Sequence, residues 1–249
     1  MLMRKFLVNV EFDGKRYAGF QKNANTKTVQ AEIENALKKL FEKDIDIVGS
    51  SRTDAGVSAR DFYFVFSTDT KLPADRVAYK LNRFLPKDIQ CQQSREVKQN
   101  FDLRKNILSK TYKYSLYVSN HIKPLLNARA LQVDEPLDLE YMQICAQKLV
   151  GEKNYKSFCN INADTTSFVR KVEKIEIKQF GDEIEIYITA KNFLYNMVRI
   201  LVGTLLECGK HKLTPEQLDD LFVQKDRSKN PAKTLPPKAL VLFETKISL

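Results

Sequence analysis

Arg52 and Asp54 are the two side chains of this sequence best placed to do chemistry, because they stand in a stretch of small residues. They are two positions apart, so on an extended backbone both point to the same side. Gly49 and Gly56 flank them and allow backbone conformations that other residues avoid. Residues 49–60 contain no Lys, Glu or second Asp. The segment therefore offers one carboxylate beside one guanidinium, and neither a carboxylate pair nor a metal cage.

Two interpretations of this segment fit the spacing alone. In the first, Asp54 accepts a backbone hydrogen bond in a turn, and Arg52 is a surface charge paired with Asp61. In the second, Asp54 acts on a substrate as a nucleophile or a base, and Arg52 pairs with a carboxylate or holds a phosphate. A loop on a rigid scaffold is a frequent location for such residues.

The first half of the chain predicts a scaffold around this loop, because its hydrophobic periodicity changes between strand and helix patterns. The predicted elements are a strand at 5–12, a helix at 29–43 capped by Thr28, strands at 45–48 and 62–67, a helix at 73–84 and a strand near 89. The strand at 62–67 is apolar on both faces, which predicts a place inside the sheet. The order strand, helix, strand, strand, helix, strand is typical of the split βαβ layout and of RNA-recognition folds.

The second half repeats this alternation in outline. It predicts a strand at 111–118, a helix at 137–150, strands at 169–178 and 183–190, a nearly apolar helix at 193–208, a short helix at 215–222, a basic proline-containing loop at 225–238 and a strand at 240–246. We therefore expect an α+β fold of two RNA-recognition-like (ferredoxin-like) domains, 1–105 and 106–249, with adjoining antiparallel sheets and helices on one side. The first domain carries the Asp54 loop, and the second is expected to complete a cleft around it.

Charge and composition limit the kinds of partner that this protein is expected to bind. The formal net charge is +10, which favours a polyanion, and nucleic acid is preferred to an acidic membrane surface. No apolar run approaches the roughly 18 residues that a membrane span needs, and a strand pattern begins almost at the N-terminus, so no signal peptide is expected. The four cysteines are scattered, they form no Cys-x-x-Cys pair, and neither histidine is adjacent to one. We therefore expect no metal site, and buried, reduced thiols in a cytoplasmic protein.

A basic and aromatic segment follows the first predicted strand. Lys15, Arg16, Tyr17 and Phe20 lie together between glycines. In one interpretation they form a loop with solvated charges. In the other they bind RNA, because cations contact phosphates and aromatic rings stack on bases.

Two further residues are candidates for a substrate site. Tyr112 occupies an alternate position of a predicted strand, where an aromatic residue usually packs in the core, although it can also stack on a base. Arg199 is the one basic residue of a nearly apolar predicted helix, and such a charge needs a partner. Asp54 is the expected partner, which would keep that carboxylate ionised. Tyr114, Met197 and Val198 are expected to have structural roles.

Several motifs together resemble one family. Residues 51–57, Ser-Arg-Thr-Asp-Ala-Gly-Val, resemble the Gly-Arg-Thr-Asp-Ala-Gly-Val signature of the tRNA pseudouridine synthase A family. Residues 13–21 are similar to its Asp-Gly-x-x-Tyr-x-Gly-Trp-Gln segment, with Phe20 in place of Trp. Thr111–Tyr114 resembles its Tyr-x-Tyr strand, and residues 193–199 resemble its Phe-x-x-x-Met-Val-Arg segment. The resemblance extends over almost the whole chain.

The resemblance implies a function and roles for the residues. Members convert uridine to pseudouridine on the 3′ side of the anticodon stem-loop of tRNA, without cofactors, as homodimers. It implies that Asp54 is the essential catalyst, that Tyr112 lies against the target uracil, and that Arg52 and Arg199 match the motif arginines. The reaction breaks the C1′–N1 bond and joins C1′ to C5 of the same base. Whether Asp54 attacks the sugar, attacks the base or acts as a base stays open.

Departures from the family pattern concern residues beside the motifs. Ser51 stands for Gly, Ser58 for His, Asp102 for His in Phe-His-Ala-Arg, and Ala239 for Gly. They put the choice of substrate in question, as in a divergent paralogue, while the motif residues above are retained. The alternative function is a non-catalytic RNA-binding protein on the same fold. A nuclease is a weaker hypothesis, because neither a carboxylate pair nor a histidine lies near the motif.

Overall fold

The computed structural model describes residues 2–249, and the chain divides into two compact units. Unit 1 takes the chain up to Leu108 together with Val241–Leu249, and unit 2 is Ser109–Leu240. This division differs from the expected domains in two ways. The boundary lies slightly later than residue 105, and the C-terminal residues join unit 1, because strand β10 (Leu240–Ile247) pairs with strand β3 (Ser58–Thr68).

Unit 1 has the predicted split βαβ order. Its elements are β1 (Arg4–Phe12), α1 (Val29–Phe41), β2 (Val48–Gly49), β3, α2 (Val77–Leu81), β4 (Ile89–Val97) and β10. The sheet runs β4-β1-β3, with β2 also paired to β3, and these pairings are antiparallel. β10 joins the other end of β3 in parallel, with Val241 opposite Ser58 and Leu242 opposite Ala59. The α+β class predicted for the chain is confirmed.

Two elements of unit 1 are shorter than predicted, and side chains explain both. β2 begins only at Val48, because Gln30 and Glu34 of α1 hydrogen-bond the carbonyl and the amide of Ile47. α2 ends at Leu81 after a short 3₁₀ helix, Ala74–Arg76. The amide side chain of the next residue, Asn82, bonds both the N–H and the carbonyl of Cys91 at 2.8 Å. That contact fixes the turn into β4.

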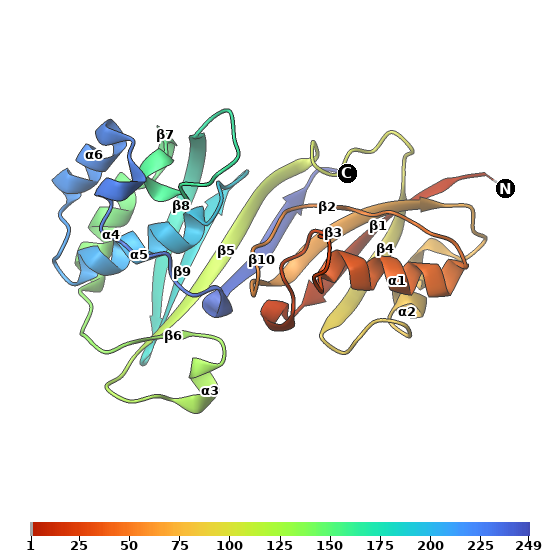
Figure 1. The fold of residues 1–249 in the computed structure, drawn as a ribbon, viewed down its shortest axis with the longest axis horizontal. Coiled ribbons are helices and arrows are strands. Elements are labelled where there is room, and N and C mark those ends of the chain that lie inside the picture. The colour runs from red at the N-terminus through yellow and green to blue at the C-terminus, as the bar shows by residue number, and fades with distance from the viewer. Residues whose placement is uncertain (1) are drawn as a thin grey trace. The chain divides into compact units, whose positions relative to one another are not determined.

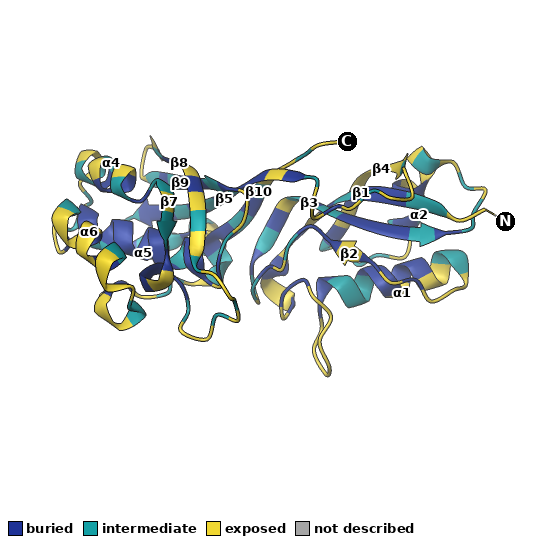
Figure 2. Ribbon diagram, turned by 90° about the horizontal axis from the view of Figure 1, so that it is seen from above, coloured by how far each residue is buried: buried dark blue, intermediate teal, exposed yellow. Residues whose placement is uncertain are grey.

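The core of unit 1 lies on both faces of its sheet. The helix side takes the alternate residues of β1 and β3, whose aromatic rings pack closely, as where Phe6 stacks on Phe66 at 5.3 Å. α1 lies along the sheet of this unit (Figure 2), and its Ile33 and Leu37 are fully buried. On the other face, a smaller cluster forms around Leu7, Val65 and Leu103. The predicted interior position of β3 is therefore confirmed.

Unit 2 also combines an antiparallel sheet with helices. Its elements are β5 (Ile107–Val118), α3 (Pro124–Asn127), β6 (Leu131–Val133), α4 (Leu139–Lys148), β7 (Gly151–Asn154), β8 (Val169–Phe180), β9 (Glu183–Ala190), α5 (Met197–Gly209) and α6 (Pro215–Gln224). The strand order is β7-β8-β9-β5, with β6 parallel to β5 at its end. α4 and α5 lie over one face of β8 and β9 (Figure 1).

α5 is the central element of unit 2 and is buried along almost its whole length (Figure 2). It begins at Met197 and not at Phe193 as predicted. The preceding residue, Asn196, has φ of +57°, a left-handed conformation that a right-handed helix cannot include. A turn over residues 194–197 precedes the helix instead, closed by the Met197 N–H on the Leu194 carbonyl at 3.1 Å.

The basic loop at 225–238 packs on α5. Asn230 is buried, and its amide nitrogen donates to the Ser157 carbonyl and to the Thr204 hydroxyl of α5, at 3.2 and 3.1 Å. Arg227 donates to the carbonyls of Asn230 and Ala232, at 2.8 and 2.5 Å. This close packing requires Gly203, because a Cβ at that position would lie 2.5 Å from the Lys233 carbonyl oxygen.

Two further observations concern the chain between residues 2 and 249. None of the helices there is long and apolar enough to cross a membrane. All four cysteines are free and buried, so the predicted burial of the thiols is confirmed.

The loop contact on α5 leads to a stability prediction for Gly203→Ala. In a helix with free space, alanine would stabilise by roughly 0.5–1 kcal/mol over glycine. Here the methyl group meets backbone, so we expect net destabilisation of about 1–3 kcal/mol, measured by urea unfolding.

Gly209→Ala, on the same helix, is the matched control, because its Cβ would meet the flexible Met142 side chain instead of backbone. We expect a smaller loss there. A stabilised Gly203→Ala protein would contradict the close packing of the loop.

Candidate active site

The Arg52–Asp54 loop of unit 1 connects β2 to β3 and is anchored to β3 at its start. Ser50 is buried, its N–H donates to the Tyr63 carbonyl at 2.8 Å, and its hydroxyl accepts the Tyr63 N–H at 3.2 Å. Small residues fold this way because their backbone groups remain accessible to neighbouring strands. Both bonds fix the loop two residues before Arg52.

Asp54 begins a tight turn. The Val57 N–H donates to the Asp54 carbonyl at 3.1 Å, and Gly56 within the turn has φ of +78°. This conformation favours glycine, which explains its place in the motif. The Asp54 side chain is half-buried. It is therefore partly shielded from solvent while its backbone is fixed.

The segment after β1 clamps the loop from the other side. Phe20 N–H donates to the Thr53 carbonyl at 3.3 Å, and Gly56 N–H donates to the Tyr17 carbonyl at 3.1 Å. Gly19, with φ of +99°, approaches so closely that a Cβ would lie 2.6 Å from the Thr53 carbonyl oxygen. The Tyr17–Phe20 segment, more than thirty residues earlier in the sequence, thus fixes the backbone of the loop around Thr53 and Asp54.

The side chains of Tyr17 and Phe20 are buried and hold this segment in place. Phe20 stacks on Phe62 of β3 at 4.2 Å between ring centroids, and Tyr17 donates its hydroxyl proton to Asp88 at 2.6 Å. Burial and that hydrogen bond raise the pKa of Tyr17. Only 3% of Tyr17 and 2% of Phe20 is exposed, so neither ring offers a face for base stacking. The structure therefore corrects the role expected of these two residues.

The charged residues of the same segment are placed differently. Lys15 and Arg16 are exposed, and Arg16 forms a long ion pair with Asp88 at 3.5 Å. Both cations are accessible to a polyanion, as the sequence predicted.

Arg52 is exposed, and no ion pair with Asp61 occurs among the described residues. Asp61 instead accepts hydrogen bonds from Asn9 at 2.5 Å and from the Thr245 N–H at 2.7 Å. The interpretation of Arg52 as the surface partner of Asp61 is therefore not supported. The guanidinium remains accessible beside the Asp54 turn.

In unit 2, Tyr112 and Tyr114 of β5 face the helices. Tyr112 is 6% exposed and packs edge-to-face on Phe193 with ring centroids 5.2 Å apart. Tyr114 is fully buried and donates its hydroxyl proton to the Pro236 carbonyl at 2.9 Å. Burial raises the pKa of Tyr114, and the nearby charge of Arg199 opposes that rise. The structural role predicted for Tyr114 is confirmed.

Arg199 lies in the first turn of α5 and is half-buried. Its Nε donates to the Leu235 carbonyl at 2.6 Å, so the 225–238 loop fixes part of the guanidinium. The sequence missed this contact, because nothing in a basic, proline-containing loop indicates which carbonyl it presents to a helix. Met197 and Val198 are buried, as predicted.

The candidate residues thus belong to two units. Arg52 and Asp54 lie in unit 1, and Tyr112 and Arg199 lie in unit 2. The expected pairing of Arg199 with Asp54, and the cleft around them, stay predictions.

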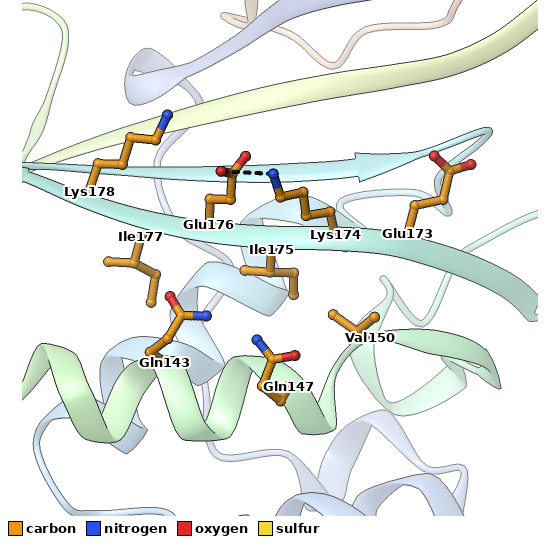
Figure 3. Close-up of a pocket in the computed structure, with 9 residues that line it drawn as sticks. All are labelled: Gln143, Gln147, Val150, Glu173, Lys174, Ile175, Glu176, Ile177 and Lys178. Atoms are coloured by element: carbon orange, nitrogen blue, oxygen red, sulfur yellow. Dashed lines mark ion pairs between the residues drawn. The ribbon is translucent and has the colours of Figure 1, made fainter.

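Residues 2–249 contain no group of three or more His, Cys, Asp and Glu side chains that could hold a metal ion. A groove of about 450 Å³ lies in unit 2 between α4 and β8 (Figure 3). Gln143 and Gln147 point into it from α4, opposite Ile175 and Ile177 of β8 (Figure 3). The groove contains none of the residues predicted from sequence to act on a substrate.

Comparison with known proteins adds independent information. The family model described as tRNA pseudouridine synthase matches residues 8–104 and 145–246. A tRNA pseudouridine synthase A of Caldicellulosiruptor bescii is 39% identical over 97% of this chain and 99% of its own length. The protein of the same name from Syntrophomonas wolfei is also 39% identical, over 97% of both chains. The residues matched by the family model lie in both units.

The clamp on the Asp54 loop predicts how Gly19→Ala behaves. Alanine at this positive φ is strained, and its methyl group would meet the Thr53 backbone, so we expect about 1–3 kcal/mol of local destabilisation. Hydrogen exchange at the Phe20 and Gly56 amides should then become about 10–100-fold faster, since 1.4 kcal/mol corresponds to a factor of ten.

Gly151→Ala is the control for the effect of backbone strain alone. Gly151 has φ of +113°, and the nearest atom to a Cβ there is a flexible lysine carbon at 3.7 Å. It should leave exchange at Phe20 and Gly56 unchanged. Equal exchange in wild type and Gly19→Ala would mean that the clamp is not tight.

Proposed function

Because the chain belongs to the tRNA pseudouridine synthase A family and isomerises uridine to pseudouridine in tRNA, we propose that Asp54 is its catalytic carboxylate. One observation supports this assignment above the others. The only carboxylate of the 49–60 segment sits on a turn whose backbone is held by β3 on one side and by the Tyr17–Phe20 segment on the other. A reacting group needs such fixed geometry.

The reaction suits this arrangement. Isomerisation breaks the C1′–N1 bond and joins C1′ to C5 of the same base, so it consumes no oxidant and no nucleotide. One ionised carboxylate next to the ribose can attack the sugar, attack the base or remove a sugar proton. A half-buried position lets Asp54 reach a flipped nucleotide and still limits competing water.

The remaining candidates have supporting roles in this proposal. Arg52, exposed beside the turn, binds a phosphate of the target strand. Tyr112 forms a wall against the uracil, supported by Phe193. Arg199 pairs with Asp54 and keeps it ionised, while the Leu235 carbonyl orients its guanidinium. Lys15 and Arg16 bind RNA phosphates, whereas Tyr17 and Phe20 act by holding the loop.

Substrate position and assembly are also proposals. The family resemblance supports a target on the 3′ side of the anticodon stem-loop, a homodimer and a cytoplasmic location. Mapping of pseudouridine in treated tRNA and sedimentation of the purified protein test the first two.

Asp54→Asn is the deciding substitution, since it preserves shape and removes the charge. We expect pseudouridine formation to fall by at least about four decades, or ~5.5 kcal/mol of transition-state stabilisation. Affinity for tRNA should stay the same or rise slightly, because it depends on dispersed cations. Single-turnover assays and filter binding measure the two quantities.

Asp46→Asn is the matched control, because Asp46 is an exposed carboxylate outside the motif. It should leave both quantities unchanged. An Asp54→Asn protein within tenfold of the wild-type rate would refute the assignment. Loss of binding and chemistry together, with normal melting, would favour the non-catalytic RNA-binding function.

The proposed Arg199–Asp54 pair predicts energetic coupling. Arg199→Ala should lower the rate, and Arg199→Lys should be intermediate, since lysine keeps the charge and loses the forked geometry. Because Asp54 is only half-buried, we expect a coupling energy of about 1–2 kcal/mol in a double-mutant cycle of stability with Asp54→Asn. Additive effects of the two substitutions would show that Arg199 acts elsewhere.

A further inference from the structure

A second group of cations in unit 2 lies outside every motif discussed so far. Lys156, Arg170 and Arg227 lie in three segments that meet near the buried Cys159. The Cys159 thiol donates to the Lys156 carbonyl at 3.4 Å, and the Lys156 ammonium and Arg170 both contact the 167–168 segment. Arg227 donates to the carbonyl of Asn230, whose side chain donates to the Ser157 carbonyl. Burial raises the pKa of that thiol, and the charges of Arg227, Arg170 and Lys156 each oppose the rise. Three cations from three separate segments therefore converge on one place. We refer to these three residues as the Cys159 cation group.

Arg170 is the most constrained member. It lies at the start of β8, its Nη1 donates to the carbonyls of Ser167 and Val169 at 3.0 and 2.7 Å, and its Nε is buried without a partner among the described residues. Burial lowers the pKa of Arg170. A half-buried guanidinium with an unsatisfied nitrogen carries an energetic cost. The fold holds Arg170 in this position although its side chain is not fully bonded.

The other two members differ in what they offer a ligand. Both terminal nitrogens of Arg227 already bind carbonyls of the 225–238 loop, so this residue contributes mainly charge. Lys156 is exposed, and its ammonium lies 5.7 Å from the centroid of the Phe168 ring. The available donors are therefore the Lys156 ammonium and the Arg170 Nη2, the terminal nitrogen that bonds neither carbonyl.

Negative charge near the group does not balance it. No member forms an ion pair with a carboxylate in the part of the chain that the structure describes. Asp226 is the nearby acid, and its carboxylate is engaged by the Ser228 N–H at 2.9 Å. The Ser228 hydrogen bonds lower its pKa most, and Lys229 and Lys156 add to that effect. The region thus keeps an excess of positive charge, which favours an anion.

The group lies beside the segment that carries Arg199. Asn160, the residue after Cys159, donates its N–H to the Tyr195 carbonyl at 2.9 Å and its side-chain amide to Asn196 at 3.0 Å. Those two residues lie between Phe193, which packs on Tyr112, and α5. Tyr195 is half exposed at 50%. The backbone of the exposed Tyr195 is therefore bonded to the residue that follows Cys159 within unit 2.

We propose that Lys156 and Arg170, with the added charge of Arg227, form a phosphate subsite for the RNA strand that flanks the target uridine. This inference rests on the proposed function, because that function supplies the RNA and places Tyr112 and Arg199 at the target nucleotide. A phosphate oxygen suits the donors, since guanidinium and ammonium groups form charge-assisted hydrogen bonds to it. The partner is thus the sugar–phosphate backbone, and base identity is not read here.

The test removes two charges and retains hydrogen-bonding side chains, in the double variant K156Q/R170Q. We expect the Kd for tRNA to rise about tenfold near 0.1 M salt, and the slope of log Kd against log salt to fall by about 1.5, as for two lost phosphate contacts. In turnover assays the loss should fall on KM more than on kcat.

The matched control is K171Q/K174Q, which removes the same number of charges from the strand that carries Arg170. Both lysines are exposed, and they lie on the opposite face of β8 from Arg170, since Val172 and Ile175 point to the buried side. We expect less than a threefold change in Kd. Equal losses of affinity and slope in the two variants would overturn the subsite, because net charge alone would then explain both. Melting curves that match wild type exclude a folding defect. If R170Q melts early, K156Q is compared with K171Q instead, with an expected fall in slope of about 0.7 for one lost phosphate contact.

A chemical change in the RNA tests the position of the subsite. Neutral methylphosphonate linkages are placed one at a time around the uridine that wild-type protein converts. At one linkage beside it, wild type should lose about fivefold in affinity and K156Q/R170Q less than twofold. Equal losses at every linkage would refute contact with the flanking strand. Absence of pseudouridine from wild-type reactions would reject the proposed function separately, while the salt slopes on bulk tRNA would still judge the subsite.

Discussion

Backbone hydrogen bonding between the Tyr17–Phe20 segment and the Asp54 loop is the constraint on which the candidate site depends. A loop with small side chains has no core of its own, so only its backbone groups can fix it. The carbonyls of Tyr17 and Thr53 and the amides of Phe20 and Gly56 satisfy one another. Gly19 makes this possible, because any larger residue would keep the two segments apart. The aromatic rings of Tyr17 and Phe20 are buried to hold the clamp in place.

In unit 2 an irregular loop is also fixed by polar contacts. The 225–238 loop is attached to the buried helix α5 through the Asn230–Thr204 hydrogen bond and through the close approach at Gly203. The loop in turn presents the Leu235 carbonyl to Arg199. In both units, a glycine allows backbone to reach backbone, and a polar contact then fixes a charged residue of a family motif. Rigid placement of this kind is what a reaction without a cofactor requires, since positioning must supply much of the rate.

Positive charge has at least two functions in this protein. Lys15 and Arg16 are exposed beside the Asp54 loop, where a dispersed charge attracts and retains RNA. Arg199 and Arg227 are half-buried and bind carbonyl oxygens, so they organise the chain as well as carry charge. The net charge of +10 therefore does not by itself give the number of cations available to phosphate. The burial and the hydrogen-bond partners of each cation distinguish those that bind phosphate from those that organise the chain.

The sequence by itself determined the α+β class, most elements and the family, because hydrophobic periodicity and a motif such as residues 51–57 are local properties. It also indicated Thr28 as a helix cap and Tyr114 as core. Tertiary structure decided what depends on distant partners. In the folded chain Tyr17 and Phe20 are buried, and Asp61 accepts hydrogen bonds from Asn9 and Thr245 in place of an ion pair with Arg52. The last strand also joins unit 1. These outcomes follow from which backbone groups and side chains meet across the fold, and no local pattern records that choice.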